Sequence, residues 1–428
     1  QAIALGVGSG NNNQGQFSIG VGSGAGQTLQ DTHSVALGYH TGYTSQSTYC
    51  IAIGDIAGET SQGTNSIAIG NTAGRYKQGT GSSGGTGGAI AIGNGAGTGT
   101  TLVGQNTNAI AIGTSSGSTA QGAESISIGS NSGQYKQGVG SGSGTGGAIA
   151  IGDNAGTGTT LIGQNSDAIA IGSDSGNVAQ GIESIAIGNY AGNDQQGGYS
   201  VAVGSGAGQT NQSTNCVAMG YQAGTTSQSQ YSVAIGDYAG NSSQGLYGVA
   251  IGTNAGLSNQ GRECVAIGQN AGSTTQGTYA VAVGTGSGQS SQGFHAVAIG
   301  TNSGQFSQAN YSICIGYEAG SSSTGANSIY LNATNVGFSN TQTSSLFINP
   351  IRNATPSVGS TQILQYDPST KEILYSTAHS DIGTTISSTN TTNTVISGGV
   401  YISLLGYTGA TPNSISIVSG VWIVTSSY

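Results

Sequence analysis

Charged residues are scarce in this chain of 428 residues, and positive charge is the scarcest, with 15 Asp and Glu but only 6 Lys and Arg. The formal net charge of −9 would repel a phosphate backbone, which argues against a nucleic-acid partner. Proline is also rare, with 4 residues beside 80 Gly, so collagen and polyproline structures are excluded. Disordered chains carry many charges and few aliphatic residues. This chain has the opposite balance, and we expect it to fold.

Long apolar runs are absent as well. No stretch of about 18 apolar residues occurs, so the sequence predicts no membrane insertion. The chain has neither an initiator Met nor a charged-then-apolar leader, which indicates a processed product or a fragment. The few lysines and the abundant Ser, Thr, Asn and Gln suit an extracellular location or a virion surface.

The dominant feature of the sequence is an internal repeat. An Ile or Val opens each string of the IAIG type, and we take it as the anchor of its repeat. Of the 19 intervals between 20 anchors, 15 are 16 residues long. The anchors are Ile3, Ile19, Val35, Ile51, Ile67, Ile90, Ile110, Ile126, Ile149, Ile169, Ile185, Val201, Val217, Val233, Val249, Val265, Val281, Val297, Ile313 and Ile329.

The four longer intervals belong to a duplicated unit of 59 residues, which spans residues 67–184. Its two copies begin at Ile67 and Ile126. Both contain YKQG, a Gly/Ser insertion, and GTGTTL followed by Val or Ile and then GQN. We expect these insertions to be loops that bulge from a regular coil.

Stacking the repeats gives columns of similar residues. The residues just before and just after the anchor are small, and the residue two after it is aliphatic. Gly stands three after and seven after the anchor, each in 19 of 20 repeats. Strict alternation is typical of a strand, and Gly marks corners that need positive φ or a close backbone approach. The sequence predicts an all-β fold, a parallel β-solenoid of about 19 coils with two short strands and two turns per coil.

A column of Gln stands eleven residues after the anchor in 14 of the 15 sixteen-residue repeats, with Thr324 as the exception. Identical amides one coil apart can hydrogen-bond along a stack, whereas a solvated turn would mix several polar residues. We favour the amide ladder over the solvated turn. The residues assigned to this structural ladder are Gln46, Gln62, Gln228, Gln244, Gln260, Gln276 and Gln292.

Both faces of the predicted strands are apolar or small, so both are expected to be buried. One face can fill the coil, but so thin a coil leaves the other face uncovered. Self-association is the simplest way to cover the second face, and three chains around a common axis would leave no long apolar patch exposed. We therefore expect a homotrimer.

Two strings, NSIAIGNTAG at Asn65–Gly74 and YSVAIGDYAG at Tyr231–Gly240, resemble the YadA-type head repeat of trimeric autotransporter adhesins. The resemblance covers residues 1–334 and implies a left-handed β-roll in which three chains pack side by side. The usual period of that head is shorter than 16 residues. The longer variant, together with the segment Ser345–Ser376, resembles repeat proteins of giant DNA viruses and phage fibres. The association with a virion and with host attachment comes from this resemblance alone.

The C-terminal part of the chain has a different character. Residues 335–383 are interpreted as a capping or neck segment, with strands at Ser345–Ile351 and Gln362–Tyr366 and a hairpin turn at Asp367–Glu372. Residues 384–428 are expected to form a small β module. Its strands are predicted around Tyr401, Ser416 and Trp422.

Residues with reactive side chains are few and scattered. Three of the four Cys stand in the small column before the anchor, and the nearest two, Cys216 and Cys264, are three coils apart, about 14 Å and beyond disulfide reach. We interpret them as small buried residues, while an inter-chain disulfide at a three-fold axis stays open. The His residues and carboxylates lack metal-ligand spacing and acid–base partners. We expect no catalytic residue, no metal, no cofactor and no enzyme.

Aromatic residues share the column two before the anchor. An exposed stripe of this kind could contact a host-surface glycan, another fibre or a host protein. Aromatic rings usually cover apolar edges, so packing at the rim of a coil or between chains is the interpretation that we favour. The tyrosines assigned to the candidate surface contact are Tyr199, Tyr231, Tyr247, Tyr279 and Tyr311.

Two functions fit these expectations. The leading one is a non-enzymatic, homotrimeric fibre or adhesin that projects a rigid rod for surface attachment. The alternative is a subunit of a self-polymerising extracellular filament or sheath, joined by strand addition between protomers. An ice-binding solenoid would need a Thr-x-Thr column, and only scattered cases such as Thr98–Thr100 occur.

Overall fold

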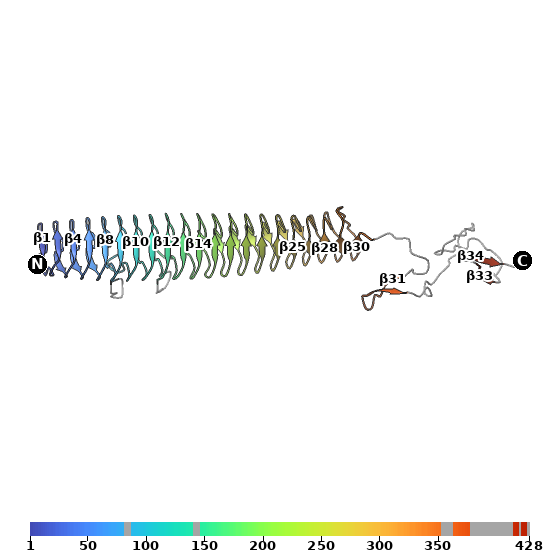
Figure 1. Cartoon of the computed structure of the whole chain (residues 1–428), viewed down its shortest axis with the longest axis horizontal. Helices are drawn as coiled ribbons and strands as arrows, with labels where there is room; N and C mark the ends of the chain where they lie inside the picture. Colours follow the sequence, from blue (N-terminus) through green and yellow to red (C-terminus); the bar gives the residue numbers. More distant parts are fainter. Residues whose placement is uncertain (81–86, 140–145, 352–362, 377–413, 419–420, 426–428) are drawn as a thin grey trace. The chain divides into compact units, whose positions relative to one another are not determined.

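The chain forms two compact units, Gln1–Ile351 and Arg352–Tyr428, which are described separately. The computed structural model describes residues 1–80, 87–139, 146–351, 363–376, 414–418 and 421–425. The first unit is a row of flat coils that follow one another along a single axis (Figure 1). All regular elements of the described residues are β-strands.

One long sheet runs the length of the first unit and contains 21 strands. Twenty of them start at the predicted anchors, and the last is added beyond them. The strands are β1 (Ile3–Leu5), β2 (Ile19–Val21), β4 (Val35–Leu37), β6 (Ile51–Ile53), β8 (Ile67–Ile69), β9 (Ile90–Ile92), β10 (Ile110–Ile112), β11 (Ile126–Ile128), β12 (Ile149–Ile151), β13 (Ile169–Ile171), β14 (Ile185–Ile187), β15 (Val201–Val203), β17 (Val217–Met219), β19 (Val233–Ile235), β21 (Val249–Ile251), β23 (Val265–Ile267), β25 (Val281–Val283), β27 (Val297–Ile299), β28 (Ile313–Gly316), β29 (Ile329–Asn332) and β30 (Leu346–Asn349).

The strands of this sheet pair in parallel, each with its equivalent in the next coil. Val233 lies opposite Val249, and Ala234 lies opposite Ala250. The sixteen-residue period is therefore the length of one coil, and the longer repeats keep the same register, as at Ile67 opposite Ile90. The predicted all-β parallel solenoid is confirmed, with 21 strands in the long sheet where about 19 coils were expected.

A second strand forms in nine of the fifteen coils of regular length, and in the others the same position makes only isolated parallel bridges, as at Thr119 opposite Tyr135. The second strand begins with Thr or Ser and ends at the Gln of the conserved column. These strands make one sheet of three strands and one of six, both parallel. They are β3 (Thr28–Gln30), β5 (Thr44–Gln46), β7 (Thr60–Gln62), β16 (Thr210–Gln212), β18 (Thr226–Gln228), β20 (Ser242–Gln244), β22 (Ser258–Gln260), β24 (Thr274–Gln276) and β26 (Ser290–Gln292).

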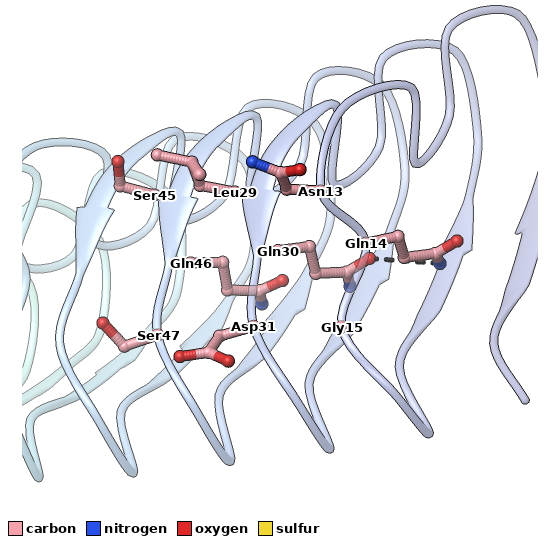
Figure 2. A pocket seen from close by; sticks show the side chains of 9 residues that line it. All are labelled: Asn13, Gln14, Gly15, Leu29, Gln30, Asp31, Ser45, Gln46 and Ser47. Carbon is pink, nitrogen blue, oxygen red and sulfur yellow. Dashed lines mark hydrogen bonds between the residues drawn. The ribbon is translucent and has the colours of Figure 1, made fainter.

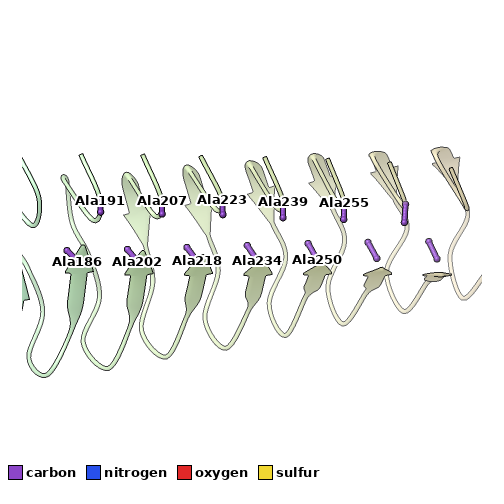
Figure 3. Close-up of a cluster of buried hydrophobic side chains, with 13 residues drawn as sticks. Ala186, Ala191, Ala202, Ala207, Ala218, Ala223, Ala234, Ala239, Ala250 and Ala255 are labelled. Atoms are coloured by element: carbon purple, nitrogen blue, oxygen red, sulfur yellow. The ribbon is translucent and has the colours of Figure 1, made fainter. Parts of the chain in front are cut away.

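The interior of the coil is filled by alanine. One row of Ala comes from the middle of the long-sheet strands, and a second row faces it from six residues after the anchor (Figure 3). Ala234 and Ala239, for example, are fully buried. Two backbone layers that approach this closely leave room for a methyl group but not for a larger apolar side chain. The small column is therefore the inner face of the strand.

Glycine makes the corners. Gly236, three after its anchor, has a φ of 126°, and a Cβ placed there would lie 2.8 Å from the carbonyl carbon of Gly252 in the next coil. Gly240, seven after the anchor, has a φ of 53°, and its Cβ would lie 2.8 Å from Oε1 of Gln244. Both the left-handed backbone and the close approach of the next coil require glycine here.

The solenoid extends further than predicted. Strand β30 pairs with β29, so that Tyr330 lies opposite Phe347, and the first compact unit ends at Ile351 rather than at residue 334. The aromatic rings of Tyr330 and Phe347 stack with centroids 4.8 Å apart. The expected neck segment therefore begins with one more coil, because its apolar residues continue the same ladder.

The second unit contains two antiparallel hairpins. Strands β31 (Ile363–Tyr366) and β32 (Ile373–Ser376) are joined at the predicted turn, where the amide of Asp367 donates to the carbonyl of Glu372 over 2.9 Å. Strands β33 (Ser414–Val418) and β34 (Val421–Thr425) form the other hairpin. The strand predicted around Tyr401 lies outside the described residues.

Candidate interaction surfaces

The outer face of the long sheet carries an aliphatic stripe, made of the anchor residues and the residues two after them. The strand alternation that points Ala234 inward points Val233 and Ile235 outward. Val233 is half-buried and Ile235 is 37% exposed. This exposure agrees with the expectation that one thin coil covers only one face of its strands, and the burial of the other face by partner chains stays a prediction. Exposed members of the stripe include Leu37, Ile112, Ile128, Ile171, Ile187, Met219, Ile267, Ile299 and Ile315.

The glutamine column lies inside the coil. Figure 2 shows Gln14, Gln30 and Gln46 in a row, each on its own coil, with Gln14 donating to Gln30. The same view shows a surface hollow beside them, whose only charged lining residue is Asp31. Gln46 is fully buried. A long polar side chain can occupy this interior because its NH₂ group finds acceptors: Gln46 donates to the carbonyl of Val35 and to Oε1 of Gln62, although its own Oε1 has no partner.

Each buried amide bonds to its own coil and, in many coils, to the next. Gln276 donates from Nε2 to the carbonyl of Val265 over 2.8 Å and to Oε1 of Gln292 over 3.0 Å. Gln260 in turn donates to Gln276 over 3.2 Å. Gln244 is buried in the same row, but its amide bonds to the carbonyls of Val233 and Gly248. The other amide pairs in the predicted ladder are Gln46–Gln62, Gln62–Gln78, Gln212–Gln228 and Gln292–Gln308.

The aromatic column lies at the coil surface, and its rings stack along the rod. Tyr231 and Tyr247 stack with centroids 5.2 Å apart, and His295 stacks between Tyr279 and Tyr311 at 4.7 and 5.4 Å. All four tyrosines of these stacks are exposed, as is Tyr199. In the single chain these rings stack on one another, and the packing at the rim of a coil or between chains that we favour stays a prediction. Their role as a glycan or protein contact stays a prediction.

The four cysteines are free and buried inside the coil. Burial raises the pKa of the Cys50 thiol to about 11 and that of Cys314 to about 12. Burial also raises the pKa of Cys216 and Cys264. Since each side chain points into its own chain, an inter-chain disulfide is not accessible in this structure.

We expect the native thiols to resist alkylation. The thiolate is the reactive form, and both the raised pKa and the burial suppress it at about pH 8. Mass spectrometry after treatment with iodoacetamide should find the native chain unmodified and the urea-unfolded chain modified at all four positions. Rapid modification of Cys50 in the folded chain would contradict the inward orientation.

The titratable groups do not assemble into a reactive centre in the part of the chain that the structure describes. His33 and His295 lie between aromatic rings, and His40 lies between Tyr39 and Tyr43. No group of three His, Cys, Asp or Glu side chains within the described ranges has metal-binding geometry. Asp55 accepts a hydrogen bond from Asn71 in the next coil, an ordinary surface contact.

Comparisons with protein-family models, curated proteins and solved structures find no match to this chain. Among the described residues, no helix has the length and apolar character needed to cross a bilayer. The fold defines the class of the protein, a parallel β-solenoid.

The sequence pattern missed one structural column. The second Ala row, six residues after the anchor, was not singled out, although it forms half of the apolar interior. Its signal was present, since Ala, Ser or Thr fills this position in coil after coil, as at Ala239, Ser287 and Thr41. Where the two Ala rows face each other, the thin coil leaves room only for side chains of these sizes.

Proposed function

We propose that the chain is a non-enzymatic structural protein that forms a rigid homotrimeric rod for attachment at a virion or cell surface. The observation that supports this most directly is the aliphatic stripe. It follows the long sheet from coil to coil, and side chains such as Ile235 and Ile267 are more than a third exposed. Contiguous apolar surface of this extent is typical of an interface.

The aliphatic stripe of a second copy of the chain is suited to pack against this stripe. The spacing between neighbouring coils is identical in every copy, so the aliphatic side chains of two copies can interdigitate along the whole rod. A partner of different periodicity would match only a few coils. The number of three chains, and the association with a virion or adhesin, come from the resemblance of the repeat to YadA-type heads.

The rigidity of the rod follows from its bonding. Backbone ladders join all neighbouring coils, and buried amides add further bonds between many of them. Such a structure holds its ends apart at a fixed distance, which is what a stalk or spike requires.

Sedimentation of the full chain tests the proposal. We expect a species of three times the chain mass, and we expect the double variant Ile235→Asp, Ile267→Asp to be monomeric while it keeps its β-type circular dichroism. The matched control is Ser243→Asp with Thr275→Asp, which adds the same charge on exposed positions of the other sheet. A wild-type chain that stays monomeric at all accessible concentrations would contradict the proposal.

The filament function remains the second candidate, and one observation favours it. Within the described residues β30 pairs only with β29, so one edge of its backbone is open to a further strand. Electron micrographs separate the two functions, since discrete rods support the attachment fibre and continuous threads support the filament.

A further inference from the structure

Each copy of the duplicated unit projects one short loop from the solenoid, at residues 99–104 and 158–163. The loops lengthen their coils by four residues, yet Gln105 and Gln164 still occupy the buried Gln row. At the loop tips Leu102 is 76% exposed and Leu161 is 75% exposed. Large apolar side chains with this exposure have no role in packing the chain.

Each loop is closed by a local set of hydrogen bonds. The hydroxyl oxygen of Thr100 accepts from the amides of Leu102 and Val103 at 3.3 and 3.0 Å. Lys77 of the preceding coil donates from Nζ to the carbonyl of Leu102 over 3.0 Å. The second loop repeats these contacts with Thr159, Leu161, Ile162 and Lys136 at the same distances. We call each loop with its lysine a knob.

The knobs have diverged less than the coils that carry them. The two copies of the unit differ at 18 of 59 aligned positions, including the buried pairs Ala68/Ser127 and Ala73/Ser132. Residues 97–106 and 156–165 differ only in the exchange of Val103 for Ile162. Exposed loops ordinarily vary more than the core.

The local fold explains only part of the sequence identity between the two knobs. It explains Gly99, which has a φ of 67°, and Thr100, which closes the loop. It does not explain Leu102, whose side chain lies in solvent. The retained leucine therefore indicates a role at the surface.

The lysines give the knobs a charge that is rare in this chain. Lys77 and Lys136 are two of its six cationic residues, and the net charge is −9. Neither forms an ion pair within the described residues, whereas Arg75 is paired with Glu59 at 2.6 Å. An ammonium group has three donors, so each lysine keeps donors for a partner after bonding the leucine carbonyl.

We propose that the two knobs form a bivalent docking site for an acidic protein partner. An apolar pocket of the partner receives Leu102 or Leu161, and a carboxylate beside that pocket pairs with Lys77 or Lys136. The knobs are three coils apart, about 14 Å along the rod, so one partner or two linked copies can engage both and gain avidity. An anionic bilayer is disfavoured, because two leucines bury little area. The proposal does not depend on the trimer.

A displayed library of random peptides, selected on the full chain, supplies the probe. We expect the selected peptides to combine Asp or Glu with large apolar residues. Calorimetry with the best peptide should give two sites per wild-type chain, one in Leu102→Ser or Leu161→Ser, and none in the double variant. Leu29→Ser is the matched control, because Leu29 is an exposed leucine in a column that carries Ser at Ser45 and Ser61. It should keep both sites.

The lysines are tested with the same peptide. Lys77→Gln with Lys136→Gln should weaken binding about twofold to fivefold and flatten its salt dependence, as for an exposed ion pair. Circular dichroism verifies that each variant keeps its fold. A library that yields no peptide preferring the wild type to the double leucine variant overturns the proposal. Leucine-dependent binding to phosphatidylserine vesicles, with no peptide selected, overturns it in favour of a membrane.

Discussion

Ala234→Phe is expected to abolish folding of the solenoid around β19. Ala234 is fully buried, and its row faces the row of Ala239 across the thin interior. A Cβ at Gly240 would already lie 3.1 Å from the Cβ of Ala234, so a benzyl group has no space without separating the two backbone layers. Overpacking an ordinary core costs about 1–3 kcal/mol. Here the cost is larger, because backbone rather than flexible side chains forms the walls.

The matched control is Ile235→Phe, one residue along the same strand but on the outer face. Ile235 is 37% exposed, so the same ring meets solvent or a partner chain and the coil should stay folded. Circular dichroism and the yield of soluble protein measure both variants. A soluble Ala234→Phe protein with the wild-type β signal would show that the small column is not the inner face.

Much of the solenoid could be predicted because its columns are read directly from spacing. The period, the anchor strands and the corner glycines follow from elementary strand alternation and from backbone constraints such as that at Gly236. Alternation alone does not say which face is inner. That choice depends on the distance between the two backbone layers, which admits the methyl group of Ala234 and rejects the side chain of Ile235.

Two residues near the C-terminal end of the solenoid depart from the column pattern, and the structure connects them. Thr324 interrupts the Gln column, and Tyr330 interrupts the small column in the next coil. The Tyr330 hydroxyl accepts from the amide of Gly325 over 2.8 Å and donates to the carbonyl of Asn340 over 2.6 Å. Tyr330 thereby supplies the interior filling that Ala and Gln supply elsewhere. The sequence shows both exceptions, but only the packing connects them.

The position of the Gln row and the orientation of the aromatic column were harder to predict. Polar residues near turns are ordinarily solvated, so only the constancy of the column indicated a special role for Gln276. The tyrosines lie at corners with a left-handed backbone, such as Tyr231 with a φ of 59°. This conformation directs each ring outward and over the ring of the next coil, which no propensity for Tyr would indicate.

Gln276→Leu is expected to destabilise the rod by at least about 3 kcal/mol, since it leaves several buried polar groups without partners. Gln276 bonds to the carbonyls of Val265 and Ala280, donates to Gln292 and accepts from Gln260. Leucine has a similar volume but none of these bonds. Because each coil contacts only its neighbours, the damage should be local, with loss of amide protection in the coils of Gln260 and Gln292.

Hydrogen exchange read by mass spectrometry, together with urea unfolding, measures both parts of this expectation. The control is Gln269→Leu, which makes the same substitution at an exposed position of the same coil, outside the buried row. It should leave stability and protection unchanged. If Gln276→Leu is as stable as this control, the amide row is a by-product of the fold and its hydrogen bonds do not hold the coils together. If protection is lost only near Gln276, the row stabilises the rod coil by coil.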